Sequence, residues 1–402
     1  MKQKRLMLLG GLSYLLPVIR EAHNMGIYVI TADYLPNNIA HKYSDEYCNV
    51  SIIDKEEVLK KAQSLQIDGI MSFAVDPGVV SAAYVAEKMQ LPFQCSYKAA
   101  TILQNKHLFR QFLAENGFNS PKAKGYNNVN EALEDVDFFS WPVIVKPVDS
   151  AGSKGVSKVE RKEDLSEAIS YALSEAHNGY FIIEEFLEKE GNSSGIEAYI
   201  QGEQVLCNDL YDQLFDDNAV NPFTPSAEIW PSSMPLNYQC EIKEELKRLF
   251  ILLNVRTGIF NVECRVSTNG KAYLMEVSPR GGGNRIAELQ DMATGQSLIS
   301  AEICKAVSLP LPKIESPSYK GAWCNYVLHS SKPGVLGSID FDKDFLHKYV
   351  KDVSLTVKQG DAISTFTGAN TSLGTVFLYA ESRPELNEVL RKINNYIHIK
   401  LK

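Results

Sequence analysis

The sequence predicts a protein of the α/β and α+β classes, in which a parallel α/β unit at the N-terminus is followed by a larger mixed unit and a C-terminal α+β lobe. Short apolar runs alternate with helical patterns up to about residue 95, the pattern changes near residue 96, and the last portion mixes strands with a helix near Pro384 to Tyr396. Alternating strand and helix patterns imply a parallel sheet covered by helices. We therefore expect units at residues 1–95, 96–310 and 311–402.

Composition and charge exclude several classes of protein. With 402 residues, 45% of them hydrophobic and 22% charged, the chain is typical of a soluble globular protein. The net charge of -8 gives no general attraction to nucleic acid or anionic lipid. No apolar run approaches the roughly 20 residues that span a bilayer, and the N-terminus lacks the small-residue cleavage site of a secretory signal. The seven cysteines form no CxxC pair, so we expect a cytoplasmic protein with reduced thiols and no nucleic-acid or membrane partner.

The first unit reads as repeated strand and helix. Strands are expected at residues 5–11, 27–33 and 68–74, and helices from about Asp54 and after Asp76-Pro77-Gly78. Gly10-Gly11 after the first strand and Asp33 after the second suggest a dinucleotide-binding turn. However, Leu12 and Leu15 occupy the places of the second and third glycines of that fingerprint, so no nicotinamide cofactor is expected.

The second unit begins with a helix expected from Lys106 to Asn116, which Gly117 ends. A strand, a glycine-bearing loop and another strand follow in residues 141–159, and a further strand runs into acids in FIIEEFL, residues 181–187. In the loop KPVDSAGSKGV, small residues leave backbone N–H groups accessible to phosphate oxygens. The loop joins two strands, whereas a Walker motif leads into a helix, so we interpret it as a flap over phosphates. A flexible hairpin tip is the alternative.

A hairpin is predicted in residues 259–278, because Asn269-Gly270 is the strongest short-range signal for a two-residue turn. If Thr268 pairs with Lys271, then Glu263 faces Glu276 directly. The same register pairs Asn261 with Ser278, Val262 with Val277, and Cys264 with Met275. One face of the hairpin is then apolar and the other carries the acids.

The two opposed glutamates indicate a metal site. Side chains directly opposite in an antiparallel pair lie about 5 Å apart at Cβ, and like charges there destabilise the sheet unless a positive charge lies between them. Two carboxylates together with substrate phosphate oxygens are a usual way to hold Mg²⁺. The alternative is that the acids pair with Arg265 and Arg280 on a solvated face, and a bulge at the turn would break the register.

The ordered set of these motifs resembles the ATP-grasp superfamily. The set comprises Lys106 on a helix, Lys146 before SAGSKG, the run IIEEFL, then NVEC and LMEVSPRGGG, and the resemblance covers about residues 1–310. It implies a pre-ATP-grasp α/β domain followed by an ATP-grasp fold, with a small flap subdomain at about residues 120–187.

The resemblance also implies roles for particular residues. Lys106 and Lys146 would contact the α- and β-phosphates of ATP, and Arg280 would neutralise the γ-phosphoryl group. The flap would close over the nucleotide through Ser150, Gly152, Ser153 and Gly155. Adenine would be held by Glu184 and the backbone of Glu185, Phe186 and Leu187, and ribose by Glu190 or Glu188. Mg²⁺, for which Mn²⁺ can substitute, would be held by Glu263 and Glu276, with Asn261 and Ser278 beside them.

Two features near the second glutamate bear on specificity. Family members usually carry asparagine where Ser278 stands, and a hydroxyl is a poorer metal ligand than an amide carbonyl. Arg285 is placed to bind a substrate carboxylate through its planar guanidinium group. The alternative for Arg285 is a salt bridge to Glu288 on the following helix.

The implied activity is that of an ATP-dependent ligase. It would activate a small-molecule carboxylate as an acyl phosphate and join it to a small-molecule amine, releasing ADP and phosphate. A phosphoribosylamine–glycine ligase, a bicarbonate-using carboxylase or carbamoyl-phosphate enzyme, and a non-catalytic ATP-binding sensor are the alternatives. Glu228 and Trp230 either border the acceptor pocket or belong to a structural turn, and a homodimer is possible.

Overall fold

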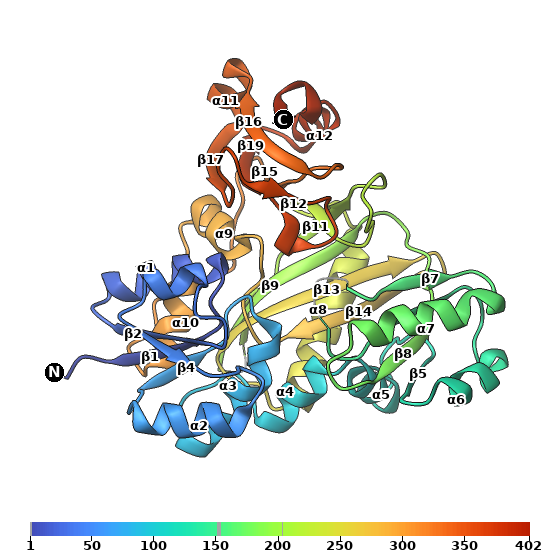
Figure 1. Ribbon diagram of the computed structural model, residues 1–402, viewed down its shortest axis with the longest axis horizontal. Coiled ribbons are helices and arrows are strands. Elements are labelled where there is room, and N and C mark those ends of the chain that lie inside the picture. The colour runs from blue at the N-terminus through green and yellow to red at the C-terminus, as the bar shows by residue number, and fades with distance from the viewer. Residues whose placement is uncertain (1, 151–153, 203) are drawn as a thin grey trace.

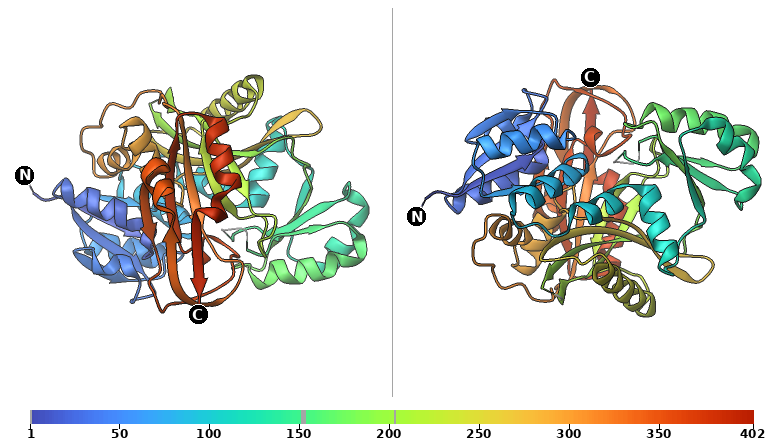
Figure 2. Two further views of the ribbon diagram at one scale, coloured as in Figure 1. Left: turned by 90° about the horizontal axis from the view of Figure 1, so that it is seen from above. Right: turned by 90° about the horizontal axis from the view of Figure 1, so that it is seen from below.

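The structure is a computed structural model that describes residues 2–150, 154–202 and 204–402. Figure 1 shows three masses around a central sheet: the N-terminal unit, a flap of green strands and helices on the opposite side, and the C-terminal lobe above them. The two further views in Figure 2 show the N-terminal unit and the flap on opposite sides of the molecule.

The N-terminal unit is a parallel sheet of order β3-β2-β1-β4, as the strand–helix repetition predicts. Its elements are β1 (Arg5–Leu9), α1 (Leu16–Asn24), β2 (Tyr28–Asp33), β3 (Glu46–Asn49), α2 (Lys55–Ser64), β4 (Gly69–Met71) and α3 (Asp76–Met89). The last four residues of β1 and the last five of β2 are buried, which is expected of a parallel sheet with helices on its faces. The sequence analysis missed β3, because EYCN is short and polar.

Two short helices connect this unit to the rest of the chain. They are α4 (Tyr97–Gln104) and α5 (Lys106–Glu115). The Asn105 side chain accepts a hydrogen bond from the N–H of Leu108 and so caps α5. This cap fixes Lys106 at the first position of the helix, and Arg110 lies one turn further on the same face.

The flap is an antiparallel sheet of order β5-β8-β6-β7 covered by α6 and α7. Its elements are β5 (Ala123–Tyr126), α6 (Val129–Glu134), β6 (Val143–Pro147), β7 (Ser157–Val159), α7 (Leu165–Ser174) and β8 (Phe181–Glu185). The predicted pair of strands around the glycine-bearing loop is confirmed by β6 and β7, which pair directly. Gly152 and Ser153 lie outside the described residues.

A nine-stranded sheet forms the centre of the molecule, with the order β14-β13-β9-β11-β12-β15-β19-β17 and β10 beside β9. Its first six strands in chain order are β9 (Ser193–Gln201), β10 (Gln204–Cys207), β11 (Leu210–Phe215), β12 (Pro225–Trp230), β13 (Gly258–Ser267) and β14 (Lys271–Ser278), and the last two form the hairpin that carries Glu263 and Glu276. The helices that pack around them are α8 (Leu236–Leu252), α9 (Ile286–Thr294) and α10 (Leu298–Ala306).

The C-terminal residues extend this sheet and add a small one of order β18-β16-β20. The elements are β15 (Ala322–Leu328), β16 (Gly334–Phe341), α11 (Lys343–Tyr349), β17 (Val350–Leu355), β18 (Ala362–Ile363), β19 (Gly374–Ala380), α12 (Arg383–Arg391) and β20 (Ile397–Leu401). Because β15 pairs with β12, the sheet continues across the boundary predicted near residue 311.

The predicted register of the hairpin is correct at the acids and wrong at the turn. Ser267, not Thr268, pairs with Lys271, so the turn has three residues, and Gly270 adopts a left-handed φ of 73° there. Cys264 pairs with Leu274 and not with Met275. A bulge between Glu263 and Cys264 takes up the one-residue difference, so that Glu263 still faces Glu276.

The glycine-rich loop after β14 packs against the N-terminal unit. The backbone N–H of Ala74 donates to the carbonyl of Gly281 at 3.1 Å. A Cβ at Gly281 would lie 2.4 Å from the Phe73 ring, whereas one at Gly283 would meet no atom within 4 Å. Only a residue without a side chain fits at Gly281. No helix within the described residues has the length and apolar character to cross a membrane.

We expect Gly281→Ala to lower the free energy of unfolding by about 1–3 kcal/mol, the usual range for an overpacked contact, because the methyl group collides with the Phe73 ring. Urea unfolding measures this loss. Gly283→Ala is the matched control and should stay close to wild type. Equal stability of the two variants would show that the loop and the Phe73 ring separate freely.

Candidate active site

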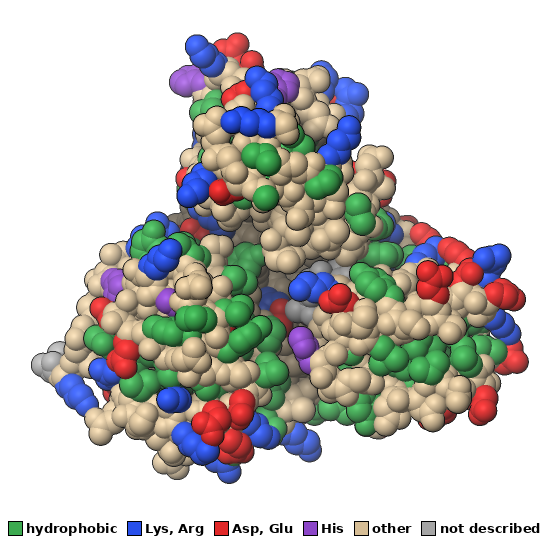
Figure 3. Space-filling view, in the orientation of Figure 1, with side chains coloured by type: hydrophobic (Ala, Val, Ile, Leu, Met, Phe, Trp, Pro, Cys, Tyr) green, Lys and Arg blue, Asp and Glu red, His purple; other side chains and the backbone are tan. Residues whose placement is uncertain are grey.

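A cavity of about 430 Å³ lies between the N-terminal unit, α4, α5, the flap and β14. Its wall includes Asp76 from α3, Lys106 from α5, Ser150 from the flap, and Glu276 from β14. Figure 3 shows a hollow at this junction of the N-terminal unit and the flap. Three residues predicted to handle phosphate or metal, Lys106, Ser150 and Glu276, are therefore brought to one cavity from different parts of the chain.

Glu263 and Glu276 face each other across β13 and β14, and Glu276 lines the cavity. Burial, and then the charge of Glu276, raises the pKa of Glu263 to about 7. The Nζ atom of Lys106 is 4.0 Å from a carboxylate oxygen of Glu276. A carboxyl pair with so little positive compensation fits a divalent cation. Within the described residues no group of three or more His, Cys, Asp or Glu side chains could hold a metal, so phosphate oxygens would have to complete the shell.

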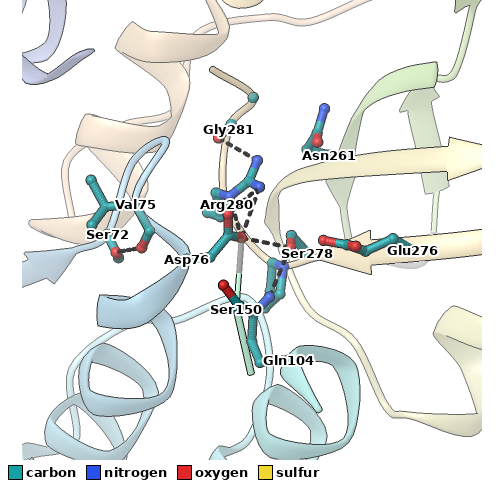
Figure 4. Close-up of polar contacts among 12 residues, drawn as sticks. Ser72, Val75, Asp76, Gln104, Ser150, Asn261, Glu276, Ser278, Arg280 and Gly281 are labelled. Atoms are coloured by element: carbon teal, nitrogen blue, oxygen red, sulfur yellow. Dashed lines mark hydrogen bonds and ion pairs between the residues drawn. The ribbon is translucent and has the colours of Figure 1, made fainter. Parts of the chain in front are cut away.

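Asn261 and Ser278 are also opposed in the hairpin, and both are already hydrogen-bonded. The amide nitrogen of Asn261 donates to Glu197 at 3.1 Å, which leaves its carbonyl oxygen, the ligand-type atom for Mg²⁺, outside that bond. The hydroxyl of Ser278 donates to Asp76 at 2.9 Å and accepts from Gln104 at 2.8 Å. Ser278 thus serves first to join β14 to the N-terminal unit, as Figure 4 shows.

Arg280 is paired with Asp76, a contact that the sequence analysis did not anticipate. Its Nε and Nη2 donate to the two carboxylate oxygens of Asp76, both at 2.8 Å, and Nη1 donates to the carbonyl of Gly281 at 3.0 Å (Figure 4). Burial opposes the charge of Arg280, but the Asp76 carboxylate more than offsets this and raises the pKa of the guanidinium. A guanidinium has five N–H donors. Three are used here, so one on each terminal nitrogen is left for a phosphoryl group.

The two predicted phosphate-binding lysines have different partners. Lys146 forms an ion pair with Glu184, which also accepts a hydrogen bond from Arg110 at 2.9 Å. Burial alone would raise the pKa of Glu184, but the two cations hold it at about 2, whereas burial lowers the pKa of Lys146. Lys106 donates to the backbone carbonyl of Ser150 at 2.8 Å and so reaches the start of the flap loop.

The run expected to hold adenine is anchored in the flap. The backbone N–H of Glu185 donates to the carbonyl of Lys122, and that of Phe186 donates to the carbonyl of Pro142, both at 2.9 Å. The carbonyl of Leu187 accepts from Arg265 at 3.5 Å. Next to this run, the N–H of Glu190 donates to the carbonyl of Val266 and the carbonyl of Glu188 accepts from Thr268, which ties the run to the β13 hairpin. At the other end of the flap loop, Gly155 has a left-handed φ of 69°.

Arg285 forms the salt bridge that was the alternative prediction for it. Its Nε and Nη2 donate to Glu288 at 3.1 and 3.2 Å, and Nη2 also donates to Asp352 on β17 at 2.7 Å. Glu288, Asp352 and the hydroxyl of Thr375 take four of its five N–H donors, so Arg285 would have to release a partner to bind a substrate carboxylate through two N–H groups. Its expected substrate role therefore stays a prediction.

Arg110 and Asp76 are the site residues that sequence reasoning missed. A signal existed for Arg110, since it follows Lys106 by four residues and shares its helix face. Asp76 was noted only as part of a helix start. Nothing in the sequence indicates that it reaches Arg280, because the two are 204 residues apart in the chain, one at the start of α3 and the other in the loop after β14.

Comparison with known proteins places the central part of the chain in a family. The family model for the ATP-grasp domain matches residues 139–288. The chain carries an ATP-grasp domain. The match includes Lys146, the flap from β6 to β8, both glutamates and Arg280, whereas Asp76 and Lys106 lie before it.

Relatives and solved structures extend the likeness beyond that domain. The C-terminal section of the carbamoyl phosphate synthase large chain from Aquifex aeolicus is 26% identical over 63% of this chain, which spans 44% of that relative. An L-amino acid ligase from Bacillus licheniformis has the same fold, with a TM-score of 0.83, 20% identity and full coverage of both chains. A phosphoribosylglycinamide synthetase from Anaerococcus prevotii gives a TM-score of 0.75 at 22% identity, again over both full chains. The chain therefore shares the fold of these two structures over its whole length.

We expect Glu263→Gln to change how stability depends on pH in metal-free protein. The folded state holds a proton on Glu263 up to about pH 7, against an ordinary pKa of 4.5, so wild-type stability falls as pH rises between these values, by up to about 3 kcal/mol. The glutamine variant lacks this decline. Urea unfolding at pH 5 and pH 8 with a chelator measures it.

The control for this prediction is Glu244→Gln, which changes an exposed acid on α8 and should keep the wild-type pH dependence. Identical pH dependence in wild type and Glu263→Gln would mean that Glu263 ionises without cost in the folded protein.

Proposed function

We propose that this protein is an ATP-dependent ligase that activates a carboxylate as an acyl phosphate and joins it to an amine, releasing ADP and phosphate. The observation that carries the proposal is the opposed pair Glu263 and Glu276 at a cavity that Lys106 also lines, with Arg280 bound to the Asp76 of that wall. Pairs of acids that hold Mg²⁺ beside cations that bind phosphate are what phosphoryl transfer requires.

In this mechanism the residues act by positioning and charge neutralisation. Glu263 and Glu276 would hold Mg²⁺, or Mn²⁺ in its place, with Asn261 beside them, and the ion would neutralise phosphate charge. Lys106 and Lys146 would contact the α- and β-phosphates. The two free N–H groups of Arg280 would stabilise charge on the transferring γ-phosphoryl group. The flap would exclude water, which would otherwise hydrolyse the acyl phosphate.

The substrates are drawn from the classes that the relatives represent. An amino-acid ligase has the highest TM-score of the neighbours described, and both it and the phosphoribosylglycinamide synthetase align over the full chain. We therefore place amino acids first as substrates and a phosphoribosylamine with glycine second. We further propose the unit boundaries 1–95, 96–310 and 311–402, a cytoplasmic location and a homodimer.

The experiment that tests the function is ADP release from Mg-ATP with a panel of single carboxylates, bicarbonate and acid–amine pairs. One pair should stimulate turnover, and Glu276→Gln should reduce that turnover by roughly a thousandfold or more, since it removes a metal-binding charge needed in the transition state. ATP binding without stimulated turnover across the panel would favour the sensor alternative.

A second prediction concerns Asp76. Asp76→Asn should lower kcat roughly tenfold or more, with little change in the KM for ATP, because it loosens the orientation of Arg280, whose charge acts in the transition state. Steady-state kinetics separate the two constants. Asp68→Asn is the control, since it changes an acid of the same unit that pairs with Lys4. A rise in the KM for ATP alone would assign Asp76 to nucleotide binding instead.

A further inference from the structure

The buried acid Glu228 is hydrogen-bonded to the loop that carries Arg280, through Asn284, and has no role in the mechanism above. It is 1% exposed and sits on β12, directly opposite Asn325 on β15. Its two carboxylate oxygens accept hydrogen bonds from the side-chain amides of Asn284 at 3.0 Å and Asn325 at 2.9 Å. Both of these donors are neutral, and no ion pair among the described residues involves Glu228. Glutamate is almost never fully buried unless it is paired with a cation.

Asn325 provides an independent observation. Its side chain is 0% exposed, and its amide nitrogen donates to Glu228 and to the carbonyl of Asn284. Its amide oxygen is buried and accepts no hydrogen bond from any described residue. A buried acceptor without a donor is rare in native proteins, and its usual explanation is a ligand, ion or water.

The acceptors in this cluster match one kind of ligand. A carboxylate offers roughly four acceptor positions, and the two asparagines fill two of them on Glu228. Together with the oxygen of Asn325, at least three positions are left. A primary ammonium group has three N–H donors and one positive charge, so it would satisfy the hydrogen bonds and the charge together.

The cluster is connected to the metal-binding hairpin through the loop that carries Arg280. Asn284, which donates to Glu228, belongs to the loop of Arg280 and follows Gly282 by two residues, a span of at most about 7 Å. The N–H of Gly282 donates to Glu197, the acid that also binds Asn261. The guanidinium of Arg285, the residue that follows Asn284, is held by Glu288 and Asp352 and not by Glu228.

We propose that Glu228 and Asn325 form a subsite for the ammonium group of a substrate. This inference rests on the proposed ligase function and narrows its substrates to compounds that carry a primary amine. Amino acids fit this class, whereas bicarbonate does not. The competing explanation is that Glu228 stays protonated and serves only to join β12 to β15.

Binding of methylammonium tests the subsite without any turnover. At constant ionic strength, methylammonium chloride should raise the Tm of the wild-type protein, whereas tetramethylammonium chloride, which has the charge but no N–H donors, should not. Glu228→Gln keeps the shape of the side chain, so the variant should fold. Because it lacks the negative charge, its Tm should not rise with methylammonium chloride. Glu244→Gln on the exposed face of α8 should keep the rise. An equal response to the two cations, or an undiminished response in Glu228→Gln, would overturn the proposal.

Kinetics supply the second readout once the panel has given a substrate pair. Glu228→Gln should raise the KM for the amine-bearing substrate roughly tenfold or more, because a charge-assisted bond is lost, and leave the KM for ATP unchanged. Asn325→Ser, which also removes the unpartnered oxygen, should act in the same direction. An unchanged amine KM in both variants would overturn the subsite even if the ligase function holds. Failure of the whole panel would count against the function, and the methylammonium result would then decide the subsite.

Discussion

Two glutamates that face each other across an antiparallel hairpin are the constraint on which the rest of the site depends. Like charges at such a position destabilise a sheet, and here they are partly buried as well. The nearest cations only partly compensate, since Lys106 is 4.0 Å from Glu276 and Arg280 is bound by Asp76. The hairpin therefore keeps a negative potential, which suits a divalent cation with bound phosphates.

The bulge that preserves this pairing also joins the hairpin to the flap. Met275 is the extra residue of the bulge, and its carbonyl accepts a hydrogen bond from Arg110 at 2.9 Å. Arg110 in turn binds Glu184, which pairs with Lys146 at the start of the flap loop. Because Glu184 is held between two cations, it fixes a phosphate-binding lysine in a buried position that would otherwise disfavour its charge.

The N-terminal unit completes the site from the opposite side. Phe73 packs against Gly281, Ala74 binds its carbonyl, and Asp76 orients Arg280 (Figure 4). A loop with three glycines is flexible by itself, because glycine has the largest conformational freedom of any residue. Contact with the bend between β4 and α3 and with the first residue of α3 holds this loop in one conformation and fixes the orientation of Arg280.

The sequence by itself determined the parallel N-terminal sheet, the flap strands and the facing glutamates, because these follow from local periodicity and turn residues. It mislocated the turn, since a three-residue turn and a compensating bulge differ from a two-residue turn only in packing. Only the tertiary structure decided what binds Arg280, Lys146 and Glu228. Those partners, Asp76, Glu184 and Asn325, are distant in the chain, and hydrogen bonds between distant residues leave no periodic signal in a single sequence.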